Sequence, residues 1–253
     1  MSNSLLKTTI ASIAACIVGS FCLFVNSADA NLFVSPLYLK MESEKGQSKG
    51  VLQIGNTSSQ PIRVRLSATA FTYDRDGSFR RLESNGKSQG DLTPYLRYSP
   101  REMIISANSS RRVRVISLLP PSLPEGEYRT AIFAETLQSK TSDRGYKIGF
   151  NLSVGSALYV AKGETEAEIE IANSNYDSTE KKLKLLVANN GSATAKGKIN
   201  WTLKQNGKVI ASGESGSAFL PKSQTNIVLN RSNKEKIDFA SGKYQLEGRI
   251  VWD

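Results

Sequence analysis

The sequence predicts an all-β protein built from two β-sandwich domains. Short runs rich in Val, Ile, Leu and Thr alternate with clusters of turn-forming residues, a pattern typical of sandwiches. No stretch keeps a sustained helical period. A charged segment without bulky apolar residues, AKGETEAE at 161–168, separates two groups of strands and is the expected link. We therefore expect one domain over residues 31–162 and another over 163–253.

Residues 1–30 predict a leader for export. Lys7 is the charge near the start, an apolar stretch runs from about Thr8 to Val25, and Ala28-Asp29-Ala30 fits a cleavage site. We expect cleavage between Ala30 and Asn31 and a periplasmic protein. No later segment is long and apolar enough to cross a membrane.

Two other interpretations of the leader stay open. Residues 13–16, IAAC, resemble a lipoprotein cleavage box, although apolar residues continue well beyond Cys16. The apolar stretch is also just long enough to span a bilayer as an uncleaved anchor.

The rare residue types exclude several kinds of chemistry. Both cysteines, Cys16 and Cys22, lie in the leader, and the chain has no histidine. The exported part therefore has no disulfide, no thiolate metal ligand and no histidine-based triad. It also lacks the G-x-x-x-x-G-K-[ST] loop that cradles nucleotide phosphates. We expect a protein that is not an enzyme and uses no metal, cofactor or ATP. A hydrolase would need two carboxylates converging about 5–10 Å apart.

The formal net charge is +10. A basic surface can serve nucleic acid, anionic lipid headgroups or an acidic protein partner. Export argues against nucleic acid. Because the basic residues are spread along the chain, the simpler interpretation is that they line solvent-facing strands and sheet edges.

The first group of strands begins with a run over 31–41 that Pro36 interrupts. Proline in a strand indicates an edge or a switch between sheets. Residues 83–93 are polar and contain glycine, so we expect an exposed loop there. The other expected strands of this group cover 50–56, 62–71, 101–106, 111–119, 127–137 and 146–163.

The second group is expected at 169–173, 181–190, 196–205, 207–214, 224–229 and 243–252. Both groups place Gly-x-Tyr directly before a strand, at Tyr128 and Tyr244. In immunoglobulin-like sandwiches such a tyrosine bonds back to upstream main chain and fixes a corner between the sheets. The alternative is an ordinary, partly buried tyrosine.

The expected strand at 146–154 bears most directly on function, because of its alternating pattern. From 146 to 154 every even position is apolar, while the odd positions are Lys, Gly, Asn and Ser. The apolar row consists of Tyr146, Ile148, Phe150, Leu152 and Val154. It can pack under the protein's own second sheet, as most alternating strands do. It can also be lent to another chain.

Several segments of the first half resemble the periplasmic chaperones that assemble pili by the chaperone–usher route. The segments are IGNTSSQPIRVRLSATAF at 54–71, SPREMIISANSSRRVRV at 99–115 and LPEGEYRTAIFAE at 123–135, followed by the alternating strand. The resemblance covers roughly residues 33–163. It implies two immunoglobulin-like domains set at an angle, like a boomerang.

The resemblance also implies a mechanism and partners. A chaperone of this family lends its alternating strand to a pilus or surface-fibre subunit that lacks its final strand, and delivers it to an outer-membrane usher. The implied donated residues are Ile148, Phe150 and Leu152, extended by Tyr146 and Val154. The other function we consider is a structural or adhesive cell-surface protein.

One family feature is missing. The family holds the subunit's terminal carboxylate with an arginine on the first strand and a lysine near the end of the donor strand. Those positions fall at about Tyr38 and Ala157, and neither is basic. The candidate replacements are Lys40, Lys147, Arg97 and Lys162.

Overall fold

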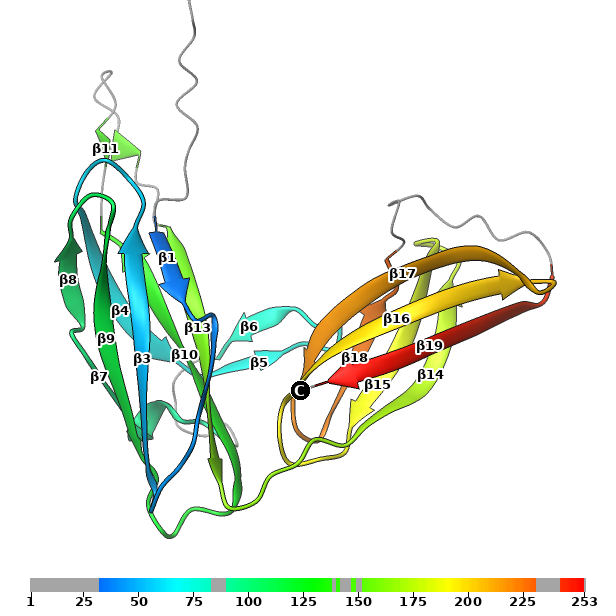
Figure 1. Ribbon diagram of the computed structural model, residues 1–253, viewed down its shortest axis with the longest axis horizontal. Helices are drawn as coiled ribbons and strands as arrows, with labels where there is room; N and C mark the ends of the chain where they lie inside the picture. Colours follow the sequence, from blue (N-terminus) through cyan, green and yellow to red (C-terminus); the bar gives the residue numbers. More distant parts are fainter. Residues whose placement is uncertain are drawn as a thin grey trace, which may run out of the picture.

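The computed structural model describes residues 32–82, 90–137, 140–141, 147–148, 152–230 and 242–252. Apart from one 3₁₀ turn, η1 (Thr93–Tyr95), the regular structure of these residues is all strand. Figure 1 shows two β-sandwiches that meet at one end and diverge at an angle. The predicted all-β class and two-sandwich architecture are confirmed. No helix within the described part of the chain is long and apolar enough to cross a membrane.

The first sandwich contains a four-stranded and a five-stranded sheet. The four-stranded sheet has the order β1 (Leu32–Ser35), β3 (Gln47–Asn56), β9 (Ser109–Leu118), β7 (Leu96–Ser99). The five-stranded sheet has the order β2 (Tyr38–Met41), β13 (Ser153–Lys162), β10 (Gly126–Thr136), β4 (Ile62–Thr69), β8 (Glu102–Ile105). Strands β2 and β13 run parallel, and the other neighbours are antiparallel.

The chain changes sheets at Pro36. Strand β1 pairs with β3, whereas β2 pairs with β13 in the opposite sheet. Proline has no main-chain N–H to donate to a neighbouring strand, so ending the strand pairing at this residue loses few hydrogen bonds. The switch expected from the sequence is confirmed.

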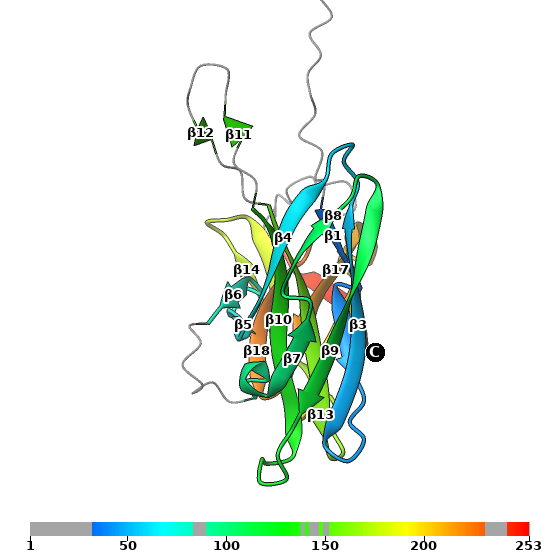
Figure 2. The ribbon, with the colours of Figure 1, turned by 90° about the vertical axis from the view of Figure 1, so that its left-hand side faces the viewer.

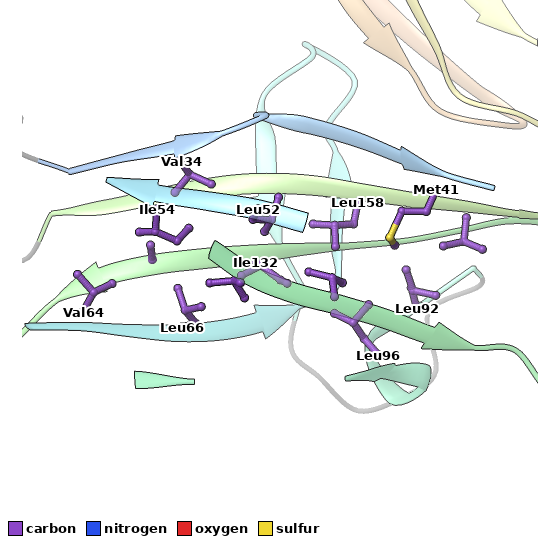
Figure 3. Close-up of a cluster of buried hydrophobic side chains, with 14 of the residues drawn as sticks. Val34, Met41, Leu52, Ile54, Val64, Leu66, Leu92, Leu96, Ile132 and Leu158 are labelled. Atoms are coloured by element: carbon purple, nitrogen blue, oxygen red, sulfur yellow. The ribbon is translucent and has the colours of Figure 1, made fainter. Parts of the chain in front are cut away.

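Alternating residues from the two sheets fill the core of the first sandwich. In β9, Val113 and Val115 are fully buried, whereas Arg112 and Arg114 are exposed. Figure 3 shows side chains from both sheets meeting in this core, among them Leu52 and Leu158. Period-2 alternation thus places one face of each strand inside and the other outside.

The second sandwich consists of two three-stranded sheets around Trp201 and Phe219. One has the order β14 (Ile169–Asp177), β15 (Lys182–Asn189), β18 (Ser223–Val228). The other has the order β17 (Lys208–Phe219), β16 (Ala195–Gln205), β19 (Tyr244–Trp252).

Two short hairpins extend from the first sandwich. One joins β5 (Phe71–Tyr73) and β6 (Phe79–Arg81) and reaches toward the second sandwich (Figure 1). The other joins β11 (Lys140–Thr141) and β12 (Lys147–Ile148), away from the second sandwich (Figure 2).

The predicted exposed loop at 83–93 is wrong at its C-terminal end. Residues 83–89 lie outside the described residues, but Leu92 is fully buried and Asp91 is 7% exposed. The Leu92 N–H donates to the Arg129 carbonyl at 3.0 Å, and the Arg129 N–H donates to the Gly90 carbonyl at 2.7 Å. These bonds attach the segment to β10, a tertiary pairing that local composition does not reveal.

Candidate functional site

The first feature of the candidate site is an open edge on β13. Strand β2 covers this edge from Ala157 to Val160, and the Ala157 N–H donates to the Leu37 carbonyl at 2.9 Å. Within the described part of the chain, no strand pairs with the same edge at Ser153 and Gly155. Main-chain groups alternate in direction along a strand, so those of Ser153 and Gly155 face this edge. Such groups are a template for a further strand.

The structure divides the apolar row between two places. Leu152 and Val154 are partly buried and pack against the core of the first sandwich. The Leu152 carbonyl accepts the Thr136 N–H at 3.0 Å, which continues the β10–β13 pairing. The Ile148 main chain lies in β12, opposite Lys140. Tyr146 and Phe150 lie outside the described residues, as does the side chain of Ile148.

The odd-numbered face of β13 carries an aromatic cluster on the outer side of the five-stranded sheet. Its buried members are Phe71, Ala131, Phe133 and Tyr159, with Tyr38, Tyr73 and Ala157 packed against them. A hollow beside the cluster has about 500 Å³ of space, open solvent included. It is lined by Leu37, Tyr73, Phe79, Ala131, Phe133, Gly155, Ser156 and Ala157. The hollow therefore adjoins the open edge.

Gly155 makes room for Phe133 in this cluster. A Cβ at position 155 would lie 2.6 Å from the Phe133 ring. The Arg81 guanidinium lies over the same ring, 3.5 Å from its centroid, and donates to the Ser153 hydroxyl at 2.9 Å. The two contacts tie the β5–β6 hairpin to the start of β13.

Tyr38 and Ala157, the two positions predicted from the resemblance to match basic residues of the family, are directly paired between β2 and β13. The Tyr38 ring packs on Tyr159 with 4.6 Å between centroids. Lys196 of the second sandwich places its ammonium nitrogen 3.4 Å from the centroid of the Tyr38 ring. The aromatic ring of Tyr38 is thus covered by a lysine from the other domain.

Two basic side chains lie on either side of Tyr159, two residues beyond Ala157 on the same face of β13. Tyr159 is paired with Lys40 on β2 and with Arg129 on β10. Burial raises the pKa of Tyr159 far above its ordinary value, so the phenol stays neutral. Burial lowers the pKa of Arg129, opposed mainly by Glu127. Lys40 and Arg129 therefore flank a neutral tyrosine as two cations.

The four predicted replacements are not gathered in one place. Lys40 lies on the aromatic face. Arg97 lies on β7, in the opposite sheet, and donates to the carbonyls of Pro94 and Leu96. Lys162 donates to the carbonyls of Pro120 at 2.9 Å and Pro121 at 2.7 Å, and also to Leu123. Lys147 is described in its main chain alone.

Arg129 and Lys196 were missed in the sequence. Arg129 follows Glu127 at the first two odd positions of β10, and this short polar pattern could have indicated an outward-facing pair. Lys196 gave no local signal, because its place depends on how the second sandwich meets the first.

The two candidate corner tyrosines differ. Tyr128 is buried, and its hydroxyl donates to the Pro124 carbonyl at 2.8 Å, four residues upstream. Tyr244 begins β19, is partly buried, and packs against the core of the second sandwich.

No family model and no curated protein matches this chain. Solved structures do match. The YadV chaperone is 11% identical, with 88% of this chain and 92% of that chain covered and a TM-score of 0.51. This chain has the fold of that chaperone. The class 5 fimbriae chaperone CfaA is 14% identical over 86% of this chain and 99% of that one, with a TM-score of 0.48. The complex of CsuC with the tip adhesion subunit CsuE, from Csu pili of Acinetobacter baumannii, matches at 14% identity over 88% and 98%, with a TM-score of 0.49.

In this fold, the open edge, the aromatic hollow and the cations around Tyr159 lie on one sheet. That sheet also contacts the second sandwich, through Lys196 and Tyr38. The site therefore offers main-chain bonding groups, apolar surface and positive charge next to one another.

Proposed function

We propose that this chain is a periplasmic chaperone that captures unfinished subunits of a pilus or surface fibre by lending them a β-strand. The observation that carries the proposal is the open β13 edge at Ser153 and Gly155, which lies at the C-terminal end of the apolar row. The fold shared with fimbrial chaperones supports it. The outer-membrane usher is the proposed recipient of the captured subunit.

The proposed bond to the subunit has two parts. A strand of the subunit pairs with the main chain around Ser153 and Gly155, as in other cases of strand addition. Upstream, Tyr146, Ile148 and Phe150 fill the space left by the subunit's missing strand. Leu152 and Val154 pack against the chaperone's own core and hold the lent strand to its owner.

The magnitudes are compatible with this role. Burying a large apolar side chain contributes about 1.5–3 kcal/mol, so three contribute roughly 5–9 kcal/mol before ordering and association costs. That is comparable to the whole stability of a small domain. The capture requires no ATP, because the stabilisation comes from burial and main-chain pairing.

We further propose that Lys40 and Arg129 attract the subunit's terminal carboxylate to the aromatic face. Both flank Tyr159 next to the Tyr38–Ala157 pair. A charge-assisted bond at this point sets the register of the added strand. Lys162 and Arg97 are less suited, because each donates to carbonyls of its own chain.

Affinity purification of the tagged chain from periplasm tests the proposal. The expected co-purifying protein is a small exported sandwich domain without its last strand. A synthetic peptide of residues 145–154, GYKIGFNLSV, is expected to compete for it, whereas a scrambled peptide is not. The double variant Ile148→Asp/Phe150→Asp is expected to fold and to capture nothing.

Ile104→Asp provides the matched control. Ile104 lies on β8, at the other edge of the same sheet, and is 63% exposed. This variant adds a charge at an exposed apolar position away from the open edge and should capture normally. Equal capture by the double variant and the wild type would refute strand lending.

A further inference from the structure

The outer side of the four-stranded sheet carries positive charge and no negative charge. We call this surface the basic face and define it by Lys49, Val51, Gln53, Arg97, Arg112 and Arg114, which point away from the core and are exposed. None of the four strands of this sheet contains an aspartate or a glutamate. The basic face lies on the opposite side of the first sandwich from the aromatic hollow.

Arginine occupies the middle of the basic face. Arg114 is paired with Val51 on β3 and with Ser99 on β7, and Arg112 is paired with Gln53. Strands β3 and β9 lie side by side (Figure 2). A hollow between these strands and β7 is lined by Val51, Ser99, Pro100, Arg112 and Arg114.

The charges of the basic face are not neutralised locally. On the five-stranded sheet Arg63 and Arg65 share Glu102, and Glu135 of that sheet pairs with Arg81 of the β5–β6 hairpin. By contrast, Lys49, Arg112 and Arg114 make no ion pair with any residue that the structure describes. Three solvated cations on one flat surface attract an anionic surface.

We propose that the basic face binds the phosphate headgroups of an anionic phospholipid membrane. Guanidinium groups bind phosphate oxygens in a bidentate manner, and the hollow between Arg112 and Arg114 offers two of them. A membrane presents phosphate groups over the whole width of this face, so the three cations Lys49, Arg112 and Arg114 can all be neutralised together. Val51, 50% exposed beside Arg114, adds apolar contact at headgroup depth.

Vesicle flotation of the full chain tests this proposal. The probes are vesicles of phosphatidylcholine alone and of phosphatidylcholine mixed with phosphatidylglycerol. The wild type is expected to bind the mixed vesicles and to dissociate as salt increases. Arg112→Gln/Arg114→Gln should weaken binding roughly 25-fold, about fivefold for each arginine.

Arg63→Gln/Arg65→Gln removes the same charge from the other sheet and should bind like the wild type. Circular dichroism checks that both variants are folded. Equal weakening in both variants would overturn the proposal, because net charge would then explain binding. Equal binding to both kinds of vesicle, or binding to poly-L-glutamate without binding to vesicles, would also overturn it, the latter in favour of an acidic protein partner.

Discussion

Glu127 of the first sandwich accepts two hydrogen bonds from Thr194 of the second. The Thr194 N–H donates to one carboxylate oxygen at 2.8 Å, and the Thr194 hydroxyl donates to the other. Both residues are buried, with Glu127 8% and Thr194 2% exposed. The carboxylate thus joins the domains where water is nearly excluded.

This contact predicts a pH dependence of stability. Burial raises the pKa of Glu127 above its ordinary value of 4.5, against the lowering effect of the Thr194 bonds. The folded chain therefore holds this proton more tightly than the unfolded chain. The resulting stability is fully present below pH 4.5 and is lost as the pH rises through the raised pKa. Each unit by which the pKa is raised corresponds to about 1.4 kcal/mol.

Urea unfolding of the wild type and Glu127→Gln across this pH range checks the prediction. Glutamine keeps the shape but does not titrate, so the difference in unfolding free energy between the two proteins should change with pH in the stated direction. A difference that stays constant would show that Glu127 titrates normally.

Leu152→Asp should destabilise the first sandwich by about 1–3 kcal/mol. Leu152 packs against the core, and a carboxylate there loses hydration without gaining a partner. Ile104→Asp, at a largely exposed position, should change stability by less than about 0.5 kcal/mol. Denaturant unfolding measures both. If Leu152→Asp were as stable as the wild type, the Leu152 side chain would not belong to the core and would instead be among the residues lent to the subunit.

Gly155→Val should cost about 1–3 kcal/mol, because the new side chain overlaps the Phe133 ring. The expected movement of Phe133 also disturbs its contact with Arg81. Adding Phe133→Leu should restore part of the loss, since the smaller side chain leaves room. Absence of any rescue would mean that another contact of Gly155 causes the effect.

Lys162→Met should reduce stability by about 1–3 kcal/mol, since it removes charge-assisted bonds to the carbonyls of Pro120, Pro121 and Leu123. Lys40→Met should leave stability nearly unchanged, because Lys40 is exposed, and should weaken capture of the subunit. Thermal unfolding and co-purification separate the two effects. If Lys162→Met instead weakened capture and Lys40→Met reduced stability, then Lys162 would be the residue that contacts the subunit and Lys40 the residue that stabilises the fold.

The sequence was sufficient for features that depend on local pattern. Alternation along the strand correctly separates the buried Val113 and Val115 from the exposed Arg112 and Arg114. Pro36 marks the point where the chain changes sheets. Both features follow from the geometry of a single strand. Tyr38 and Ala157, which counting along the chain placed at the two basic positions of the resembling family, are register partners in the structure, and their correspondence to those positions stays a prediction.

Features that depend on register or on the second domain were not predictable in this way. Leu92 is buried because its main chain bonds to β10, although its neighbours in sequence are polar. Arg129 becomes part of the site through its pairing with Tyr159, and Lys196 through the meeting of the two sandwiches. Such contacts are set by residues far apart in the chain.

The β5–β6 hairpin limits how far the two sandwiches can move relative to each other. At its turn, the Arg75 carbonyl accepts the Asn226 N–H at 2.5 Å, and the Arg75 guanidinium donates to Gln224 at 3.2 Å. The hairpin therefore adds a further contact between the two sandwiches, besides the Glu127–Thr194 and Tyr38–Lys196 contacts and the covalent connection. A single contact would leave the two sandwiches free to rotate about it, whereas several separate contacts resist such rotation. We therefore expect the angle between the two sandwiches to be fixed before another protein binds.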